Sequence, residues 1–272
     1  WRLPNETEKG PSAYYASVNW NKQSLFLDLN DPEDKNEVLE LIKDADIVLS
    51  NFKKGDDIKF GLTFEEVKKI NPSVIYGHIS GFGSDSDRVA YDLILQAETG
   101  FMSINGQPES PPTKMPLALI DLLAAHQLKE GILCAMLKQQ SGSKQALLVE
   151  VSLYDSAVAS LINQATNWLM NRNIPQRIGS LHPNIAPYGE VFKTKEDRSI
   201  TLAIGNNRQF TMLCNVLGLN GLAGKKAFET NAARVKNRDR LFKILSREIE
   251  KWEANTLLEM LHQKRIPAGE IK

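Results

Sequence analysis

Short apolar runs alternate with helical periodicities along the first third of the chain. Three of these runs predict strands, at Ser24–Leu29, Asp46–Ser50 and Ser73–Ser80. The second run is continuously apolar, which is typical of strands buried on both faces. Between the runs, apolar residues recur at helical spacing behind capping signals at Asp31 and Thr63. This alternation predicts a parallel sheet with crossover helices.

The rest of the chain predicts more helix and a second group of strands. The predicted helices lie at Tyr91–Thr99, Met115–Leu137, Asp155–Met170, Asn207–Gly218, Arg238–Trp252 and Ala254–Lys264. The predicted strands lie at Gln145–Tyr154 and, around a polar turn, twice within residues 188–204. We therefore expect an α/β fold, with a large parallel-sheet domain at residues 1–178 and a smaller α+β domain at residues 179–272.

The long helix expected at Met115–Leu137 carries an acid on its apolar side. At about 100° per residue, Asp121 lines up with the apolar residues Ala124, Ala125, Leu128 and Ile132. A buried carboxylate without a partner is costly, so Asp121 must be paired, protonated or used in chemistry. It also lies near the start of the helix, where the dipole favours negative charge. Two interpretations stay open from the pattern: a helix-capping acid or a catalytic one.

Composition narrows the class of partner. The 33 basic and 33 acidic residues cancel, and no block of like charge indicates binding to nucleic acid or to an anionic membrane. No run approaches the roughly 18 apolar residues of a transmembrane helix. The isolated Cys134 and Cys214 are expected to be buried packing residues in a reducing, intracellular compartment. Because the sequence opens without Met or a targeting pattern, we expect it to be an excerpt of a longer protein.

The sequence contains none of the metal or cofactor motifs that we looked for. The four histidines are scattered, the glycines of GFGSDSDR lack the dinucleotide pattern, and no GxSxG nucleophile elbow occurs, so no metal site is predicted. Two loops at strand carboxyl ends, Asn51–Gly55 and Gly81–Arg88, are the expected ligand-binding positions. The cations near them are Lys22, Lys53, Lys54, Lys59 and Arg88. These cations either bind a phosphate-bearing ligand or are ordinary solvated surface charges.

Five stretches resemble the class III CoA-transferases, the CaiB/BaiF family, in order and spacing. They are NKQSLFLDL, DIVLSNFKKG, NPSVIYGHISGFG, RVAYDLILQAETGFMSINGQPESPP and ALIDLLAAHQLKEGILCAML. HPNIAPYGEVFKT and GNNRQF most resemble the branch that moves CoA between succinyl-CoA and dicarboxylates such as glutarate. The resemblance implies a Rossmann-like domain, an interlocked homodimer, and a place in the mitochondrial matrix or cytoplasm. It implies CoA and acyl-CoA as substrates, with no permanently bound cofactor.

The resemblance also implies roles for single residues. Asp121 matches the family's catalytic aspartate, which attacks the acyl-CoA thioester and passes through mixed-anhydride and aspartyl-CoA intermediates. The residues matched to CoA binding are Leu27 at the adenine, Asn51, Phe52, Lys59 near the phosphates, and Tyr91 beside the thioester; Arg88 joins them as a loop cation. Tyr91 and Gln96 are matched to the substrate site.

Two alternatives to the transferase are weighed. A racemase of this family places a His where this chain has Tyr91, so its proton-transfer pair is missing. A non-catalytic CoA-binding homologue would keep Asn51 and Phe52 but would not need Asp121. The chain also departs from the family pattern: Lys22-Gln23 stands where members usually have Lys-Arg, and the family's N-terminal and C-terminal segments are absent from these 272 residues. These departures leave the activity of the isolated segment open.

Overall fold

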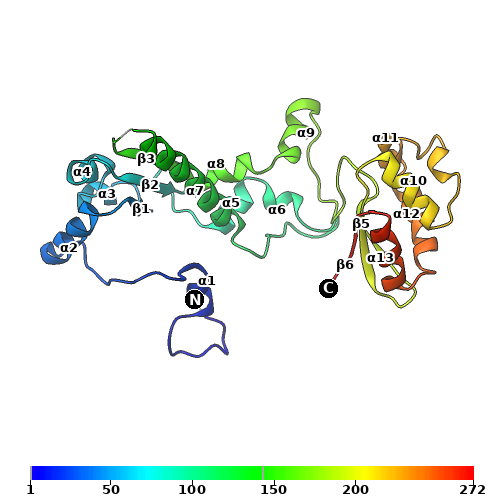
Figure 1. Cartoon of the computed structure of the whole chain (residues 1–272), viewed down its shortest axis with the longest axis horizontal. Coiled ribbons are helices and arrows are strands. Elements are labelled where there is room, and N and C mark those ends of the chain that lie inside the picture. The colour runs from blue at the N-terminus through cyan, green and yellow to red at the C-terminus, as the bar shows by residue number, and fades with distance from the viewer. Residues whose placement is uncertain (1, 143) are drawn as a thin grey trace. The chain divides into compact units, whose positions relative to one another are not determined.

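The computed structural model describes residues 2–142 and 144–272 (Figure 1). The chain divides into two compact units, Trp1–Val89 with Ala124–Ser152, and Ala90–Leu123 with Leu153–Lys272. The division falls within the long helix α7 (Leu119–Gln140). The boundary expected near residue 179 stays a prediction.

A three-stranded parallel sheet forms the centre of the first unit. Its strands are β1 (Ile47–Ser50), β2 (Ile75–Ser80) and β3 (Leu147–Ser152), in the order β1-β2-β3. All three run in the same direction, which confirms the parallel sheet predicted from the sequence.

Helices cover both faces of this sheet. On one face, Leu128 and Ile132 of α7 pack with Ile75 of β2. On the other face, Tyr76 lies in a cluster with residues of α2 (Pro32–Lys43) and α4 (Phe64–Ile70). Successive residues of a strand point to opposite faces, so Ile75 and Tyr76 belong to different clusters. The predicted caps are confirmed: Asp31 accepts from the first backbone N–H groups of α2, and Thr63 caps α4.

Two sequence expectations for this unit are wrong. Ser24–Leu29 is not a strand; Leu25 and Phe26 are exposed, and no strand of the described residues pairs with the segment. Alternation of apolar residues predicts a strand, but a strand also needs a ladder partner. In addition, β1 is not buried on both faces, because it is an edge strand and Leu49 is 63% exposed.

Helix α7 carries apolar residues on more than one side, with the charged residues Lys129 and Glu130 between them. Its sheet-facing side is buried, whereas Leu133, Cys134 and Leu137 on another side are exposed. Cys134 is therefore not the buried packing residue that we expected, although Cys214 is buried as predicted.

The second unit begins with short helices. These are α5 (Asp92–Glu98), α6 (Phe101–Ile104), α8 (Leu153–Ala159) and α9 (Asn163–Asn171). The single helix predicted at Asp155–Met170 is thus two helices, because the backbone of Ile162 has a positive φ of 46° that no helix can accommodate. The first unit also holds two short helices that we did not predict from the sequence, α1 (Ala13–Val18) and α3 (Asp56–Phe60).

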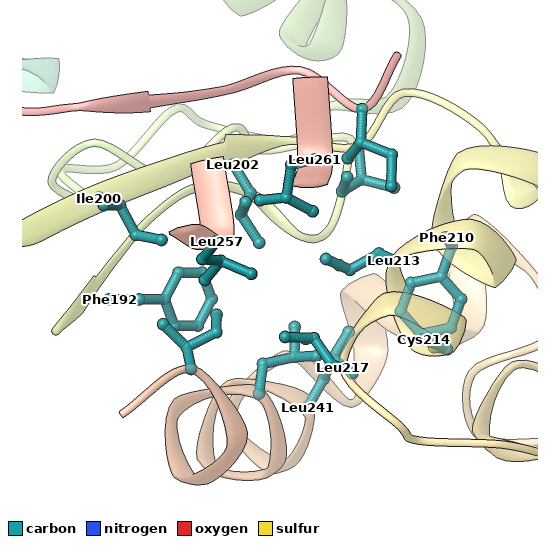
Figure 2. Close-up of a cluster of buried hydrophobic side chains, with 14 of the residues drawn as sticks. Phe192, Ile200, Leu202, Phe210, Leu213, Cys214, Leu217, Leu241, Leu257 and Leu261 are labelled. Carbon is teal, nitrogen blue, oxygen red and sulfur yellow. The ribbon is translucent and has the colours of Figure 1, made fainter. Parts of the chain in front are cut away.

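The C-terminal part of the second unit is built on an antiparallel sheet. Its strands are β4 (Tyr188–Lys193), β5 (Ser199–Ala203) and β6 (Ala268–Glu270). Its helices are α10 (Asn207–Val216), α11 (Asn231–Lys236), α12 (Arg238–Ile249) and α13 (Ala254–Gln263), with a 3₁₀ turn η1 (Leu222–Gly224). Figure 2 shows the shared core, where Phe192 and Leu202 of the sheet face Leu213, Leu241 and Leu257 of the helices. This confirms the α+β pattern predicted for the region.

Candidate active site

Asp121 lies in the first turn of α7. The helix starts at Leu119, four residues later than the periodicity predicts, because the backbone ahead of it is bound elsewhere. Met115 N–H donates to Oε1 of Gln96 at 2.7 Å, and the carbonyl of Leu117 accepts from Nε2 of Gln96 at 3.3 Å. The buried amide of Gln96 therefore holds the segment ahead of α7 and occupies the Leu117 carbonyl, which would accept a helical bond if the helix began at Met115.

The apolar stripe predicted beside Asp121 is confirmed only in part. Ala124, Leu128 and Ile132 are buried, but Ala125 and Asp121 itself are exposed. The strands pack against the later turns of α7, at Leu128 and Ile132, so the sheet covers the stripe there and not at the first turn. The expectation that Asp121 is buried among leucines is wrong for this chain.

The carboxyl group of Asp121 is nevertheless in an unusual electrostatic setting. Neighbouring protein atoms exclude part of the water around it, and this desolvation is the main reason that its pKa lies above the ordinary value of 3.8. The nearby negative charge of Asp92 raises the pKa further. Both effects act in the same direction, so Asp121 is a more basic carboxylate than a solvated aspartate.

Asp92, the first residue of α5, is a site residue that sequence reasoning missed. Its Oδ1 accepts from the backbone N–H of Ile120 at 2.7 Å, one residue before Asp121. An acid in the first turn of a predicted helix looks like an ordinary response to the helix dipole, so the local pattern does not single it out. The only signal in the sequence is its place beside Tyr91, which the family resemblance had marked.

Tyr91 precedes α5 and is exposed. Leu117 and Leu122, which flank the start of α7, are exposed as well. The second unit thus brings Asp121, Asp92 and Gln96 together, with apolar side chains open to solvent beside them.

In the first unit, residues after β1 form a second group. Phe52 is half-buried, and its ring lies 5.9 Å from that of Phe60. The ammonium group of Lys59 lies 4.7 Å from the centroid of the Phe60 ring. Asn51 is exposed at the end of the strand. Phe60 therefore connects Phe52 with Lys59, next to Asn51 at the end of β1. Their role in binding CoA stays a prediction.

An apolar cavity of about 190 Å³ adjoins this group. It is lined by Leu29, Val38, Ile42, Val48, Leu49, Ser50, Phe52, Leu62, Val67 and Tyr76. Leu29 lines the cavity, whereas Leu27, the residue matched to adenine, does not.

The two loops expected at the strand carboxyl ends are joined. Lys54 Nζ donates to the backbone carbonyl of Asp85 at 2.7 Å, which links the turn after β1 to the loop after β2. Arg88 stacks in that second loop, with its guanidinium 3.9 Å from the Phe82 ring centroid. Lys22 lies apart from these contacts, since its ammonium donates to Val18 and Asn19 of its own segment. The predicted set of cations is therefore only partly gathered.

The predicted site residues are shared between the two units. Leu27, Asn51, Phe52, Lys59 and Arg88 belong to the first unit, and Tyr91, Gln96 and Asp121 belong to the second. Among the described residues, no three His, Cys, Asp or Glu side chains are grouped so that they could hold a metal ion. Within residues 2–142 and 144–272, no helix is both long enough and apolar enough to cross a membrane.

Comparison with known proteins identifies the family. The model of CoA-transferase family III matches residues 1–272. The chain belongs to CoA-transferase family III. The resemblance inferred from the sequence motifs is confirmed.

Individual members of family III agree with this assignment. The chain is 38% identical over 264 residues to a succinate–glutarate CoA-transferase of Agrobacterium fabrum, covering 96% of this chain and 65% of that protein. It is 34% identical to an acetyl-CoA:oxalate CoA-transferase of Acetobacter aceti, covering 96% of this chain and 67% of the relative. The crystal structure of a CaiB/BaiF family protein from Brucella suis matches with a TM-score of 0.78 and 34% identity, covering 98% of this chain and 71% of that one. The chain thus spans about two thirds of the length of these family III relatives.

Proposed function

We propose that the protein carrying this chain transfers CoA from an acyl-CoA donor, succinyl-CoA, to a dicarboxylate acceptor of the glutarate type. The observation that carries the proposal is the 38% identity, over nearly the whole chain, to a relative named as a succinate–glutarate CoA-transferase. A relative that uses acetyl-CoA and oxalate is 34% identical, so the chemistry is better supported than the choice of acids. The basic carboxylate at Asp121 supports the same chemistry.

In the proposed mechanism, Asp121 is the nucleophile. Its carboxylate attacks the thioester carbonyl of succinyl-CoA and expels the CoA thiolate, which leaves a succinyl–aspartyl anhydride. The thiolate attacks the aspartyl carbonyl and releases succinate, giving an aspartyl-CoA thioester. The acceptor carboxylate attacks this thioester and again expels CoA, and the thiolate then attacks the acceptor carbonyl and frees Asp121. Each covalent step replaces one difficult exchange with easier ones.

The group at the end of β1 is proposed to bind CoA. Asn51 and Phe52 provide polar and apolar contacts, and Lys59 provides charge for the phosphates. Arg88 adds a second cation from the loop that Lys54 joins to this turn. The apolar cavity beside Phe52 supports binding of a flat part of the ligand such as adenine. Leu27, which the resemblance matches to adenine, is two residues before Leu29 of the cavity lining.

Tyr91 and Gln96 are proposed to serve the substrate site in different ways. Tyr91 is exposed and free to lie along the thioester. Gln96 is 0% exposed, and its amide is bound to Asp92, Met115 and Leu117. Gln96 therefore contributes by holding the backbone ahead of Asp121.

The assembly of the protein is also part of the proposal. The exposed apolar side of α7, with Leu133 and Leu137, supports an interlocked homodimer in which this side is covered. A large domain at residues 1–178 and a small one at 179–272 are supported by the separate hydrophobic core of the antiparallel sheet, which lies within residues 192–266. Its acyl-CoA substrates suggest a place in the mitochondrial matrix or the cytoplasm.

The decisive experiment traps the covalent intermediate. The protein, with any sequence that flanks these 272 residues, is incubated with succinyl-CoA and hydroxylamine, and its peptides are examined by mass spectrometry. A hydroxamate on Asp121 is expected, with CoA exchange into glutarate lowered at least roughly a thousandfold in Asp121→Ala. Glu65→Gln, at an exposed acid on α4 that pairs with Lys68, is the control and keeps full activity. Undiminished turnover in Asp121→Ala would overturn the mechanism.

A further inference from the structure

The carboxylate of Asp92 is fully engaged by two elements. Oδ1 accepts from the backbone N–H of Ile120, in the first turn of α7, at 2.7 Å. Oδ2 accepts from Nε2 of Gln96, one turn further along α5, at 2.6 Å. Asp92 is half-buried, and both of its bonds are the short, charge-assisted kind. The side chain therefore caps a helix to which it does not belong.

Gln96 extends the same link toward the segment before α7. Its Oε1 accepts from Met115 N–H, and its Nε2 donates to Leu117 C=O as well as to Asp92. Two side chains of α5 thus fix the backbone from residue 115 to residue 120. Asp121 is the next residue along, so the direction in which its carboxylate leaves the helix depends on this link.

We propose that Asp92 is the positioning residue for Asp121, because its carboxylate anchors the first turn of α7 to α5 and places a negative charge beside the nucleophile. The inference rests on the proposed role of Asp121. It assigns to Asp92 a part in the reaction that differs from helix capping alone. A neutral cap could still accept from Ile120 N–H, but it would not alter the basicity of Asp121.

The charge of Asp92 has a definite consequence for Asp121. Desolvation raises the pKa of Asp121 first, and Asp92 raises it further. Nucleophilicity generally rises with the pKa of the attacking group, so this repulsion favours attack on the thioester. The ionisable side chains on these helices are Asp92 and Glu98 of α5, Tyr154 and Asp155 of α8, and, besides Asp121 itself, His126, Lys129, Glu130, Cys134 and Lys138 of α7. Asp92 is the one whose charge contributes to the raised pKa of Asp121.

The test compares Asp92→Asn with Asp92→Ala in the protein with its flanking sequence. Asn keeps an oxygen that accepts from Ile120 N–H, but it removes the charge and, because its NH2 group then faces Nε2 of Gln96, it also loses the bond from Gln96. We expect Asp92→Asn to lower kcat about tenfold with KM for succinyl-CoA little changed, and to move the acid limb of kcat/KM to lower pH. Asp92→Ala also loses the cap, and its kcat falls about a hundredfold. Glu65→Gln, at an exposed pair with Lys68 on α4, changes neither quantity.

The outcomes separate this inference from the proposed function. If Asp92→Asn keeps both its kcat and its acid limb while Asp121→Ala is inactive, the positioning role is wrong and the nucleophile stands. If Asp121→Ala keeps its activity, the proposed function is wrong whatever Asp92 does. Should Asp92→Ala fail to fold by circular dichroism, Asp92→Asn alone decides, since it keeps an acceptor for Ile120 N–H.

Discussion

The backbone N–H of Ile120 donates to the carboxylate of Asp92 across 28 positions of sequence, at a distance of 2.7 Å. This bond closes the start of α7 onto α5 and leaves Asp121 as the first acid beyond the junction. Helix N-termini leave backbone donors without partners, and here a residue from another helix satisfies one of them. The cap and the candidate nucleophile are thus neighbours, so we expect a substitution of Asp92 to alter the position and the pKa of Asp121.

The pH dependence of activity follows from the setting of Asp121. A carboxylate nucleophile must be ionised, so kcat/KM is expected to fall as pH drops through the pKa of Asp121. Because desolvation and Asp92 both raise this pKa above 3.8, the fall begins at a higher pH than for a solvated aspartate. A pH–rate profile of CoA exchange measures it. An acid limb centred at or below 3.8 would contradict the assignment.

The affinity for CoA is expected to depend on Lys59. Replacing Lys59 with Ala removes a cation beside Phe52 and Phe60, and weakens CoA binding about tenfold, since charge-assisted contacts to phosphate contribute roughly 1.5 kcal/mol or more. The effect should shrink as salt is added. Calorimetric titration with CoA at low and high salt measures the affinity and its dependence on salt. Lys68→Ala removes an exposed lysine paired with Glu65 and serves as the control; equal affinities in the two variants would argue against a phosphate contact at Lys59.

The helix caps and strands that depend only on neighbouring residues could be predicted from the sequence. Asp31 and Thr63 cap the helices that they were expected to cap, and β1 and β2 lie where their apolar runs indicated. The sequence did not predict Asp92, because the partner of Asp92 is distant in the chain and no periodicity connects them. The wrong strand at Ser24–Leu29 has a related cause, since whether an apolar run becomes a strand depends on a partner that its own residues do not specify.

Gly189 lies where the neighbouring backbone leaves no room for a side chain. Its φ is +87°, and a Cβ placed there would lie 1.9 Å from the carbonyl oxygen of Ser180. Gly189→Ala is expected to lower the free energy of unfolding by roughly 3 to 5 kcal/mol, since the obstacle is backbone and cannot rotate away. Gly218 also has a positive φ but no atom within 4 Å of the added Cβ, so Gly218→Ala costs about 1 to 2 kcal/mol. Urea unfolding compares the variants, and equal losses would show that φ alone explains Gly189.

The stability of the antiparallel sheet in acid is expected to depend on Glu270. Its two oxygens accept from Nε and Nη2 of Arg198 at 2.7 and 2.6 Å, and Lys272 adds a further contact. The bonds from Arg198, followed by that from Lys272, lower the pKa of Glu270 from 4.5 to about 2. The folded state thus binds the proton less tightly than the unfolded state does, and the carboxylate stabilises the fold when it is ionised.

The sign of this effect fixes the pH range of the test. The stabilisation by Glu270 is complete above pH 4.5 and is lost as pH falls through about 2. Glu270→Gln should therefore have a lower free energy of unfolding than the unmodified protein at pH 7, with a difference that narrows between pH 4.5 and pH 2. Glu253→Gln breaks an exposed pair with Lys195 at 3.5 Å and should show almost no difference at either pH. A gap between Glu270→Gln and the unmodified protein that stays constant down to pH 2 would mean that packing of the side chain, and not its charge, holds β6 against β5.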